Sequence, residues 1–395
     1  MTDTRNLIAT LSVGNFIIGM GAFVVVGVLT PVSDYFLISP SHAGLMLTAY
    51  AVAYTIGSPL CVALTGRYSR RGVLLVGFGL FTVGSLLSAM APSAGLLNLA
   101  RVITALGAGM VTPIAAAVAL ASAPAGQQGK ALATVFFGLT LAQVVGVPLG
   151  SFLGYTFGWQ LVFYLVALLS AVVMIGVAAQ VPRDLPFQVN TLSTLAHAIL
   201  DLRSFLSVLF TASFIATFYV VYTYLAPVLT QGMGFQRNGV TLTLIVFGVG
   251  AVFGNMLGGK LTDTIGSYRT LLIACASQIV FMPMFSLLPL NEAVFLVCVF
   301  VWSLLGWAFM VAQQTRLVSQ TPQRQNVVLA LNAAAIYLGI SVGSAIGGLI
   351  IDTFGMAVLG FGGGFCALLG LVHLVLSEYV NKSRMKPNIE SRVAQ

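Results

Sequence analysis

The chain has 395 residues, of which 58% are hydrophobic and only 7% are charged, and its net charge is +8. A soluble protein carries about 25% charged residues, so this composition excludes a water-soluble globular fold and requires lipid as the solvent. The four cysteines all fall inside apolar segments, at Cys61, Cys275, Cys298 and Cys366. We expect them to be buried free thiols and not a disulfide or metal-binding set.

Apolar segments long enough to cross a bilayer recur along the whole chain. A crossing helix needs about 20 apolar residues, and the pattern predicts twelve spans. They run over approximately 7–30, 44–65, 73–91, 95–118, 131–154, 160–181, 204–229, 239–261, 270–288, 293–315, 326–350 and 358–378. The predicted fold is an all-α membrane protein of two pseudo-symmetric six-helix bundles. We expect a first bundle over 1–181, a cytoplasmic linker over 182–203, a second bundle over 204–380 and a cytoplasmic tail over 381–395.

The fifth predicted span is rich in residues that weaken helices. Between Lys130 and Arg183 no charged residue occurs, which suits two crossings joined at a turn over 155–159. The first of them carries Gly138, Gly146, Pro148, Gly150 and Gly154. Such residues destabilise soluble helices, but in lipid they let helices approach closely and bend. We therefore expect this helix to bend and to pack closely against its neighbours.

The same pattern returns 197 residues later without a gap. Gly146 and Gly150 correspond to Gly343 and Gly347, and the turn 156–158 (Thr-Phe-Gly) corresponds to the identical turn 353–355. Gly57 and Gly254 are related by the same offset, as are Leu64 and Leu261. One offset that links separate segments indicates an internal duplication, in which each half forms one bundle.

The basic residues are placed unevenly along this topology. An even number of spans puts both termini on one side, and 15 of the 17 Lys and Arg then lie on that side or at its membrane edge: Arg5, Arg67, Arg70, Arg71, Lys130, Arg183, Arg203, Lys260, Arg269, Arg316, Arg324, Lys382, Arg384, Lys386 and Arg392. Only Arg237 lies on the other side. Positive loops stay in the cytoplasm, so we predict that both termini are cytoplasmic. The positive charge then needs no nucleic-acid partner.

One ionisable residue lies well inside a span. Arg101 is in the fourth, and a charge at mid-bilayer costs about 2.5–3.5 kcal/mol, so it should face a cavity or a partner. It either bonds backbone carbonyls of a neighbouring helix or acts in a solute pathway. Asp34, at the outer end of the first span, is the acidic candidate for a proton site, or else a loop residue after Pro31. No other acid lies within a span, so the sequence does not identify the proton carrier.

Isolated polar and aromatic residues on apolar helices are the substrate-site candidates: Asn15, Gln143, Asn255, Gln313, Gln314, Asn332, Phe218, Tyr219, Tyr222, Tyr224, Trp302 and Trp307. A cavity that mixes aromatic rings with a few polar groups suits amphipathic organic compounds. For each residue the alternative role is helix–helix packing. The chain has no HExxH metal motif and no GxxxxGK[ST] phosphate loop. We expect no enzymatic activity, no metal, no cofactor and no direct use of ATP.

Two turns combine glycine with charge. The turn after the second span contains Arg67, Arg70 and Arg71, and its counterpart after the eighth span contains Gly259, Asp263 and Gly266. Opposite charges there could latch helix ends across the two halves and favour one conformation. The alternative is that both are ordinary positive cytoplasmic loops.

Twelve spans in two related halves, with these turns, resemble the major facilitator superfamily. The first turn is similar to its G-x-L-x-D-R-x-G-R-R motif, with Leu64, Arg67, Arg70 and Arg71 kept. Val62, Gly66 and Ser69 replace the first Gly, the Asp and the second Gly, which puts the usual charge latch of the first half in doubt. The second copy keeps Gly259, Leu261, Asp263 and Gly266.

Further strings resemble particular branches of that superfamily. Arg101 matches the Arg of the fourth-helix motif, and Gly138, Gly146, Pro148 and Gly150 are similar to the fifth-helix motif of exporters, although Val147 separates Gly from Pro. Three segments resemble the arabinose-efflux-permease-like and sugar-efflux group of drug:proton antiporters. They are 137–142 with 146–148, 222–229 and 254–261.

The resemblance implies alternating access around a central site lined by the first, fourth, seventh and tenth helices. It places Asn15, Arg101, Tyr219, Tyr222, Trp302 and Gln313 in or near that site. The expected function is proton-coupled efflux of small organic compounds, either drugs or sugar-like metabolites. The alternatives are a proton-coupled importer on the same fold and, from a different class, a sensor or membrane enzyme. The expected partners are a small-molecule substrate, protons and the lipid of a bacterial inner membrane, in which the protein would be a monomer.

Overall fold

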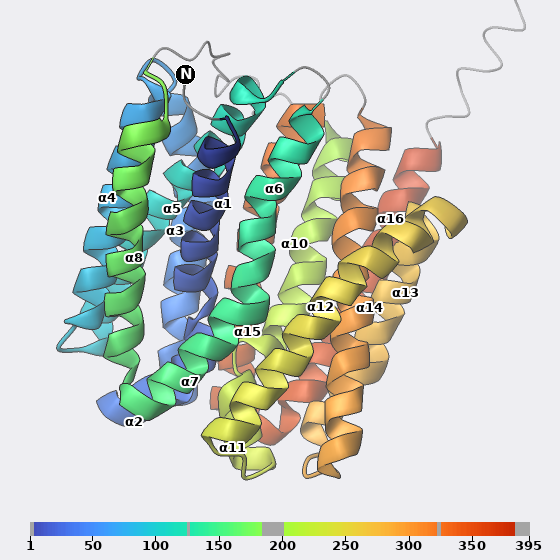
Figure 1. Ribbon diagram of the computed structural model, residues 1–395. Helices are drawn as coiled ribbons and strands as arrows, with labels where there is room; N and C mark the ends of the chain where they lie inside the picture. Colours follow the sequence, from blue (N-terminus) through green and yellow to red (C-terminus); the bar gives the residue numbers. More distant parts are fainter. Residues whose placement is uncertain (1–3, 125–126, 184–200, 322–324, 384–395) are drawn as a thin grey trace, which may run out of the picture.

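The computed structural model describes residues 4–124, 127–183, 201–321 and 325–383. In this part of the chain every regular element is a helix (Figure 1), and twelve helical segments are long and apolar enough to cross a membrane. The predicted all-α fold with twelve spans is confirmed. The predicted linker lies largely outside the described residues, and so does the predicted tail.

Several spans consist of more than one helical piece. The first six are α1 (Thr4–Phe23) with α2 (Val25–Phe36), α3 (Pro40–Leu64), α4 (Arg70–Ala89), α5 (Ala94–Ser122), α6 (Gln128–Leu141) with the π-helix η1 (Ala142–Gly146) and α7 (Val147–Phe157), and α8 (Trp159–Gln180). The second six are α10 (Leu202–Tyr222) with α11 (Leu225–Gly232), α12 (Arg237–Ile265), α13 (Ser267–Phe281) with η2 (Met282–Ser286), α14 (Glu292–Gln320), α15 (Gln325–Phe354), and η4 (Met356–Val358) with α16 (Leu359–Ser383).

Polar N-caps set where many of these helices begin. Ser39, Ser69 and Ser93 each accept a hydrogen bond from a backbone N–H in the first turn of α3, α4 and α5. Asp201 caps α10 in the same way through Ser204. Partial burial raises the pKa of Asp201, but the hydrogen bonds from Ser204 lower it, and the net pKa is below the usual value. Helices therefore start a few residues outside the apolar cores that hydropathy detects.

The two halves repeat the same helix contacts. In the first half α1 packs on α6 and α8, α5 on α3 and α4, and α4 on α8. In the second half α10 packs on α15 and α16, α14 on α12 and α13, and α13 on α16. Each contact of the first half therefore has an equivalent in the second, which is the arrangement of two pseudo-symmetric six-helix bundles.

The repeat extends to the backbone. The first helix of each half is interrupted near its middle, at Val24 between α1 and α2 and at 223–224 between α10 and α11. The turns that the sequence relates by 197 residues contain Gly158 and Gly355, whose φ angles are +94° and +84°. Backbone in this region favours glycine, so the duplicated Thr-Phe-Gly turn is a duplicated conformation.

Glycines also bring corresponding helices together. Gly138, Gly150 and Gly154 face α1 and α2, and a Cβ at Gly150 would lie 2.0 Å from Val24 Cγ2. Gly339, Gly343 and Gly347 face α10 in a similar way, and Gly347 is at the position that corresponds to Gly150. The predicted close packing of the fifth span is therefore confirmed, and the π-helical turn η1 interrupts the span beside Pro148.

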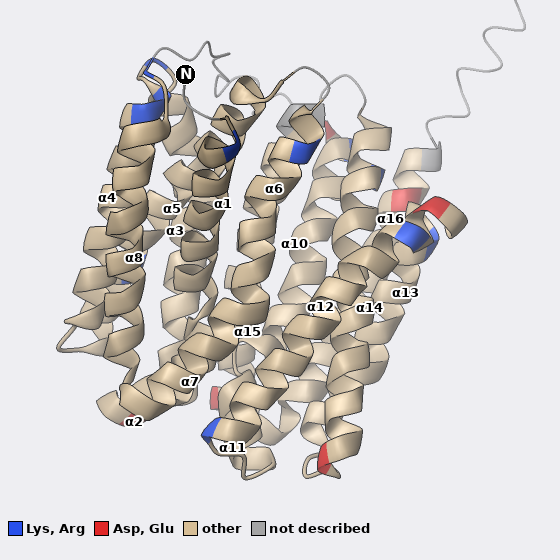
Figure 2. Cartoon of the chain, in the orientation of Figure 1, with Lys and Arg blue, Asp and Glu red and all other residues tan. Residues whose placement is uncertain are grey.

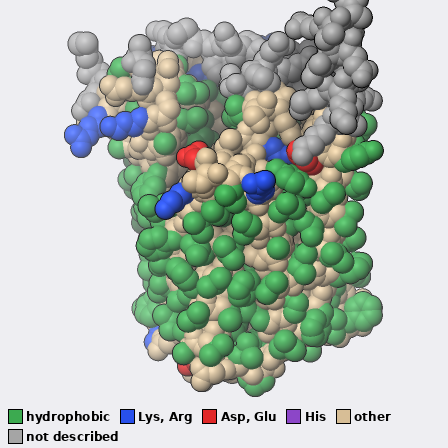
Figure 3. Space-filling model, turned by 90° about the vertical axis from the view of Figure 1, so that its right-hand side faces the viewer, with side chains coloured by type: hydrophobic (Ala, Val, Ile, Leu, Met, Phe, Trp, Pro, Cys, Tyr) green, Lys and Arg blue, Asp and Glu red, His purple; other side chains and the backbone are tan. Residues whose placement is uncertain are grey.

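The first and the last described helices have their outer ends at one face of the molecule. α1 begins and α16 ends at the same end of the bundle (Figure 1), which we call the terminal face; the other end is the opposite face. Most Lys and Arg of the helices lie at the terminal face (Figure 2). Apolar side chains cover most of the side surface shown in Figure 3, below a band of charged residues. This surface fits a protein surrounded by lipid.

The halves meet mainly toward the opposite face. There α2 contacts α11, and α12 contacts η1 and α7. α3 and α15 contact each other from mid-height to the opposite face, where the Ser41 hydroxyl donates a hydrogen bond to Asp352 Oδ1. Toward the terminal face α6 and α12 diverge (Figure 1). The structure is therefore closed at the opposite face.

Candidate functional site

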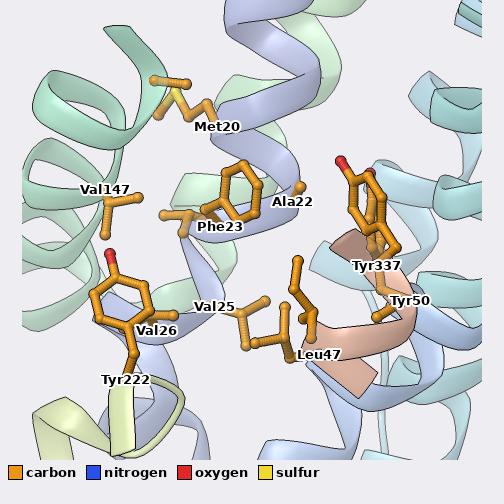
Figure 4. Close-up of a cluster of buried hydrophobic side chains, with 14 of the residues drawn as sticks. Met20, Ala22, Phe23, Val25, Val26, Leu47, Tyr50, Val147, Tyr222 and Tyr337 are labelled. Carbon is orange, nitrogen blue, oxygen red and sulfur yellow. The ribbon is translucent and has the colours of Figure 1, made fainter. Parts of the chain in front are cut away.

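Three buried tyrosines connect the halves at mid-height, and we call them the tyrosine cluster: Tyr50 and Tyr54 on α3 and Tyr337 on α15. The rings of Tyr54 and Tyr337 are stacked, with centroids 3.6 Å apart and an interplanar angle of 23°. Tyr50 lies 6.2 Å from Tyr337 (Figure 4). Aromatic contacts of this kind are specific in geometry, so the cluster defines how the halves fit together in this conformation.

Arg101 supports the tyrosine cluster from within the first half. Its side chain is fully buried, and its guanidinium carbon lies 4.5 Å from the ring centroid of Tyr50 and 5.6 Å from that of Phe163. Nη2 donates a 3.3 Å hydrogen bond to the carbonyl of Ala22, two residues before the break at Val24. Arg101 thus bonds a neighbouring backbone and also contacts a residue at the junction of the halves.

Several polar atoms near this junction have no partner. Among the described residues, Nε and Nη1 of Arg101 and the hydroxyl of Tyr50 are buried without a hydrogen bond. The same holds for Oε1 of Gln143 in η1. Buried polar groups are nearly always hydrogen-bonded, so a concentration of unsatisfied groups between two halves is typical of a site that takes up water or a ligand.

The second half contributes a compact group of aromatic rings. Phe218 stacks on Trp302 with centroids 4.7 Å apart, and Tyr222 stacks on Phe247 at 4.5 Å. Trp302 Nε1 donates a 2.7 Å hydrogen bond to Gln278 Oε1, so this indole is satisfied inside its own half. Tyr222 extends toward Val26 and Val147 of the first half (Figure 4). Tyr219 contacts Tyr222 edge to face and lies close enough to Tyr337 to interact electrostatically with it.

Other predicted site residues serve packing in this conformation. Asn15 Nδ2 donates to the carbonyl of Val135 and so joins α1 to α6. Gln313 Nε2 donates to Thr211 Oγ1, which donates to Asn332 Oδ1, and this chain joins α14, α10 and α15 within the second half. Only part of the predicted lining therefore lies at the junction of the halves.

Asp34 lies far from the tyrosine cluster. It is exposed at the end of α2, on the opposite face, where it lines a shallow pocket with Arg237 and Tyr155. Arg237 also crosses between the halves, since Nη1 donates a 3.1 Å hydrogen bond to Thr156 Oγ1. Asp34 therefore lies at the rim of the opposite face and not beside the tyrosine cluster.

Sequence reasoning missed two features of the site region. The tyrosine cluster joins residues almost 300 positions apart, and its members look like ordinary span residues. Arg316 was expected at the membrane edge and Glu378 at the end of a span, but Arg316 is only 2% exposed and forms an ion pair with Glu378 inside the second half. Arg316 is buried because it packs against α16. Hydropathy does not indicate which face of a helix is covered by a neighbour, so the sequence could not predict this burial.

Among the described residues, no ion pair joins Asp263 of the second charged turn to an arginine of the first. Arg67 is exposed, Arg71 is half-buried, and Arg70 Nη2 donates to the carbonyl of Gly66 in its own turn. Asp263 is exposed and makes no hydrogen bond or ion pair within the described part of the chain. Gly266, with φ +86°, ends α12. A latch across the terminal face would need the halves to approach there.

The contact between Ser41 and Asp352 gives a test of the closed opposite face. We expect the double variant Ser41→Cys, Asp352→Cys to form a disulfide under mild oxidation, because the native side chains are hydrogen-bonded. Oxidation should reduce transport in proteoliposomes to background, and reductant should restore it. Each single variant serves as the control, and unchanged transport in the fully cross-linked protein would show that this contact need not open.

These features define a polytopic membrane transporter of two repeated six-helix halves with an aromatic and polar site between them. The sequence profile of the Major Facilitator Superfamily matches residues 11–334, and the chain belongs to that superfamily. The predicted family is therefore confirmed. The Inner membrane transport protein YdhP of Escherichia coli is 30% identical over 367 residues, which is 92% of this chain and 91% of that protein.

Other relatives and solved structures agree with this assignment. The Probable sugar efflux transporter of Mannheimia succiniciproducens is 29% identical over 377 residues, which is 95% of this chain and 94% of that protein. A crystal structure of a bacterial homologue of the human lysosomal transporter Spinster, inward-facing and occupied, has a TM-score of 0.71 at 18% identity. The superposition covers 95% of this chain and 96% of the other chain, which shows that the two proteins share a fold.

Proposed function

We propose that this protein is a secondary active transporter that exports small organic compounds, either drugs or sugar-like metabolites, in exchange for protons. We further propose that it acts as a monomer in a bacterial inner membrane with both termini in the cytoplasm. The observation that carries the proposal is the tyrosine cluster with Arg101 at the junction of the halves. Relatives described as an inner membrane transport protein and as a sugar efflux transporter support the location and the direction.

The chemistry at the junction suits an amphipathic solute. Aromatic faces of the tyrosine cluster and of Tyr222 can stack on apolar faces of a sugar or a drug, as in other small-molecule sites. The unpaired hydroxyls and the free donors of Arg101 can bind its polar groups. A solute in this position would contact both halves, so its binding could favour one arrangement of the halves over another.

The conformation supports loading from the terminal face. With that face in the cytoplasm, as proposed, the solute would load from the cell interior while the halves are joined at the opposite face. The contacts of Ser41 and Arg237 keep the opposite face shut meanwhile. Release would require these contacts to break and the charged turns to close, which is alternating access.

The test uses purified protein in liposomes without nucleotide. A panel of labelled arabinose, glucose, lactose and ethidium is offered to vesicles with an acidic or an alkaline lumen. If the protein exchanges solute for protons, at least one compound should enter vesicles with an acidic lumen faster than it enters protein-free vesicles. A protonophore should abolish this uptake. Uptake into the alkaline lumen would support the importer instead. If no compound responds to either gradient, the proposal fails for this panel of sugars and cationic dyes.

A further inference from the structure

A second polar cluster lies inside the second half, apart from the tyrosine cluster. His373, Ser377 and Asn381 are four residues apart on α16 and share one helix face. His373 Nδ1 lies 2.8 Å from Ser213 Oγ on α10, and His373 Nε2 lies 3.1 Å from the carbonyl of Leu206. Asn381 Nδ2 donates a 3.2 Å hydrogen bond to Ser207 Oγ, also on α10. A polar seam therefore joins α16 to α10 inside the second half.

Arg316 on α14 adds a buried charge to this seam. Its Nη2 donates to Ser377 Oγ at 3.0 Å and to Glu378 Oε2 at 3.3 Å. Arg316 is 2% exposed, and its Nε and Nη1 are buried without a hydrogen-bond partner among the described residues. Ionisable residues within membrane spans are costly and usually serve proton or solute pathways.

We propose that His373 is the proton-binding residue of the transport cycle and that the Arg316–Glu378 ion pair responds to its charge. The inference rests on the proposed proton coupling and names its carrier. In the step itself, one proton from water binds to Nδ1 of the neutral imidazole, which becomes an imidazolium, and the same proton later returns to water. No other covalent bond changes.

The hydrogen bonds around His373 fit both protonation states. Nε2 faces a carbonyl and so must carry a proton in either state. In the neutral ring Nδ1 accepts the Ser213 hydroxyl proton. In the charged ring Nδ1 donates to Ser213 Oγ, whose proton can turn to the Leu209 carbonyl 3.3 Å away. Proton uptake therefore leaves no polar group of this triad unpaired.

The charges around His373 link it to the rest of the half. Phe210 separates it from Arg316, with its ring 5.9 Å from both. Arg316 is the charged group in electrostatic range, and Glu378 lies on α16 itself. The remaining charged or titratable residues on the elements packed against α16 lie farther along them: Arg203, Tyr219, Tyr222, Tyr268, Arg269, Cys275, Tyr337 and Asp352.

Protonation would therefore act on α10. An imidazolium on the other side of Phe210 from Arg316 adds like charge and disfavours the bonds that Arg316 of α14 makes with Ser377 and Glu378 of α16. α10 carries Ser213 and, five to nine residues later, Phe218, Tyr219 and Tyr222 of the aromatic group. His373 is eight residues, about 12 Å, from Asn381 near the terminal face, and it is only half-buried. A proton that reaches His373 would act on the central site through α10.

A distance measurement tests this without a known substrate. Spin labels at Lys130→Cys on α6 and Lys260→Cys on α12, with the four native cysteines replaced by serine, report the terminal-face separation in lipid nanodiscs. Pulsed electron resonance between about pH 5.5 and about pH 8.5 spans the range in which histidine titrates. We expect the populations of the open and closed distances to change with pH. The change should vanish in His373→Gln and persist in the control His42→Gln.

The outcomes separate this inference from the proposed function. The background protein is the spin-labelled protein that keeps His373. If its distance populations change with pH and those of His373→Gln change equally, His373 is not the carrier, although proton coupling stands. If the background protein shows neither a pH response nor gradient-driven uptake of the sugar and dye panel, proton coupling and this inference both fail. Ser213→Ala retains the imidazole, so it should shift the midpoint of the transition, and an unmoved midpoint would also contradict the proposal.

Discussion

Replacing Arg101 by alanine should lower the initial rate of gradient-driven transport by about 10- to 100-fold, since hydrogen bonds to charged groups contribute about 1.5–3 kcal/mol. The substitution removes the donor to the Ala22 carbonyl and the cation above Tyr50. The interruption between α1 and α2 then loses its hydrogen bond from Arg101. The tyrosine cluster loses the guanidinium that contacts the Tyr50 ring. Rates in proteoliposomes at matched protein content provide the measurement.

Two further variants separate the loss of the Arg101 contacts from the loss of a positive charge. Arg101→Lys keeps the charge but not the planar fork, and we expect intermediate loss because a lysine cannot bond the carbonyl and cover the ring together. Arg269→Ala removes an exposed cation at the terminal face and should leave the rate near that of the wild type. Wild-type transport by Arg101→Ala, with normal folding by size-exclusion chromatography, would remove Arg101 from the site.

Replacing Gly343 by alanine should destabilise the second half by about 1–3 kcal/mol, the usual cost of overpacking a core. A Cβ at this position would lie 2.2 Å from the carbonyl oxygen of Ala216, which is backbone of α10 and cannot move alone. α15 would have to shift away from α10. Cys275 is the buried one of the four cysteines, since Cys61, Cys298 and Cys366 are only half-buried. With those three replaced by serine in every variant compared, the reaction of Cys275 with a fluorogenic thiol reagent during thermal unfolding in detergent measures the loss.

Gly259 offers a matched control on the same half. A Cβ there meets nothing within 4 Å, and alanine favours a helix over glycine by about 1 kcal/mol. Gly259→Ala should therefore unfold at the wild-type temperature or slightly above it. Equal unfolding temperatures for the two alanine variants would show that the close glycine contacts do not hold α15 against α10.

The fold could be predicted from local features of the sequence because lipid imposes simple rules. Spans must be apolar and helical, and the glycines repeated at an offset of 197 mark equivalent contacts, as Gly146 and Gly343 show. The interruption at Val24 was not predictable, since no Gly or Pro lies at that residue. It appears only in the folded chain, where α1 ends at Phe23 and Arg101 donates a hydrogen bond to the nearby Ala22 carbonyl.

The site was less predictable because a sequence indicates how deep a residue lies in the membrane but not which way its side chain points. Asn15 is polar and lies in the first span, yet its amide is satisfied by the Val135 carbonyl of α6. Tyr54 and Tyr337 are unremarkable in their own spans and acquire their role only when the two halves meet. Arg101 was found because a single charge in an apolar segment needs a physical reason.

Alternating access is tested most directly by two distances measured in one preparation under a proton gradient. One label pair, Lys130→Cys with Lys260→Cys, spans the terminal face, and the other, Leu37→Cys with Gln231→Cys, spans the opposite face; all four residues are exposed. The account predicts that the first distance shortens as the second lengthens, and that both return when the gradient is removed. Distances that change together, or that stay fixed while transport continues, would contradict it.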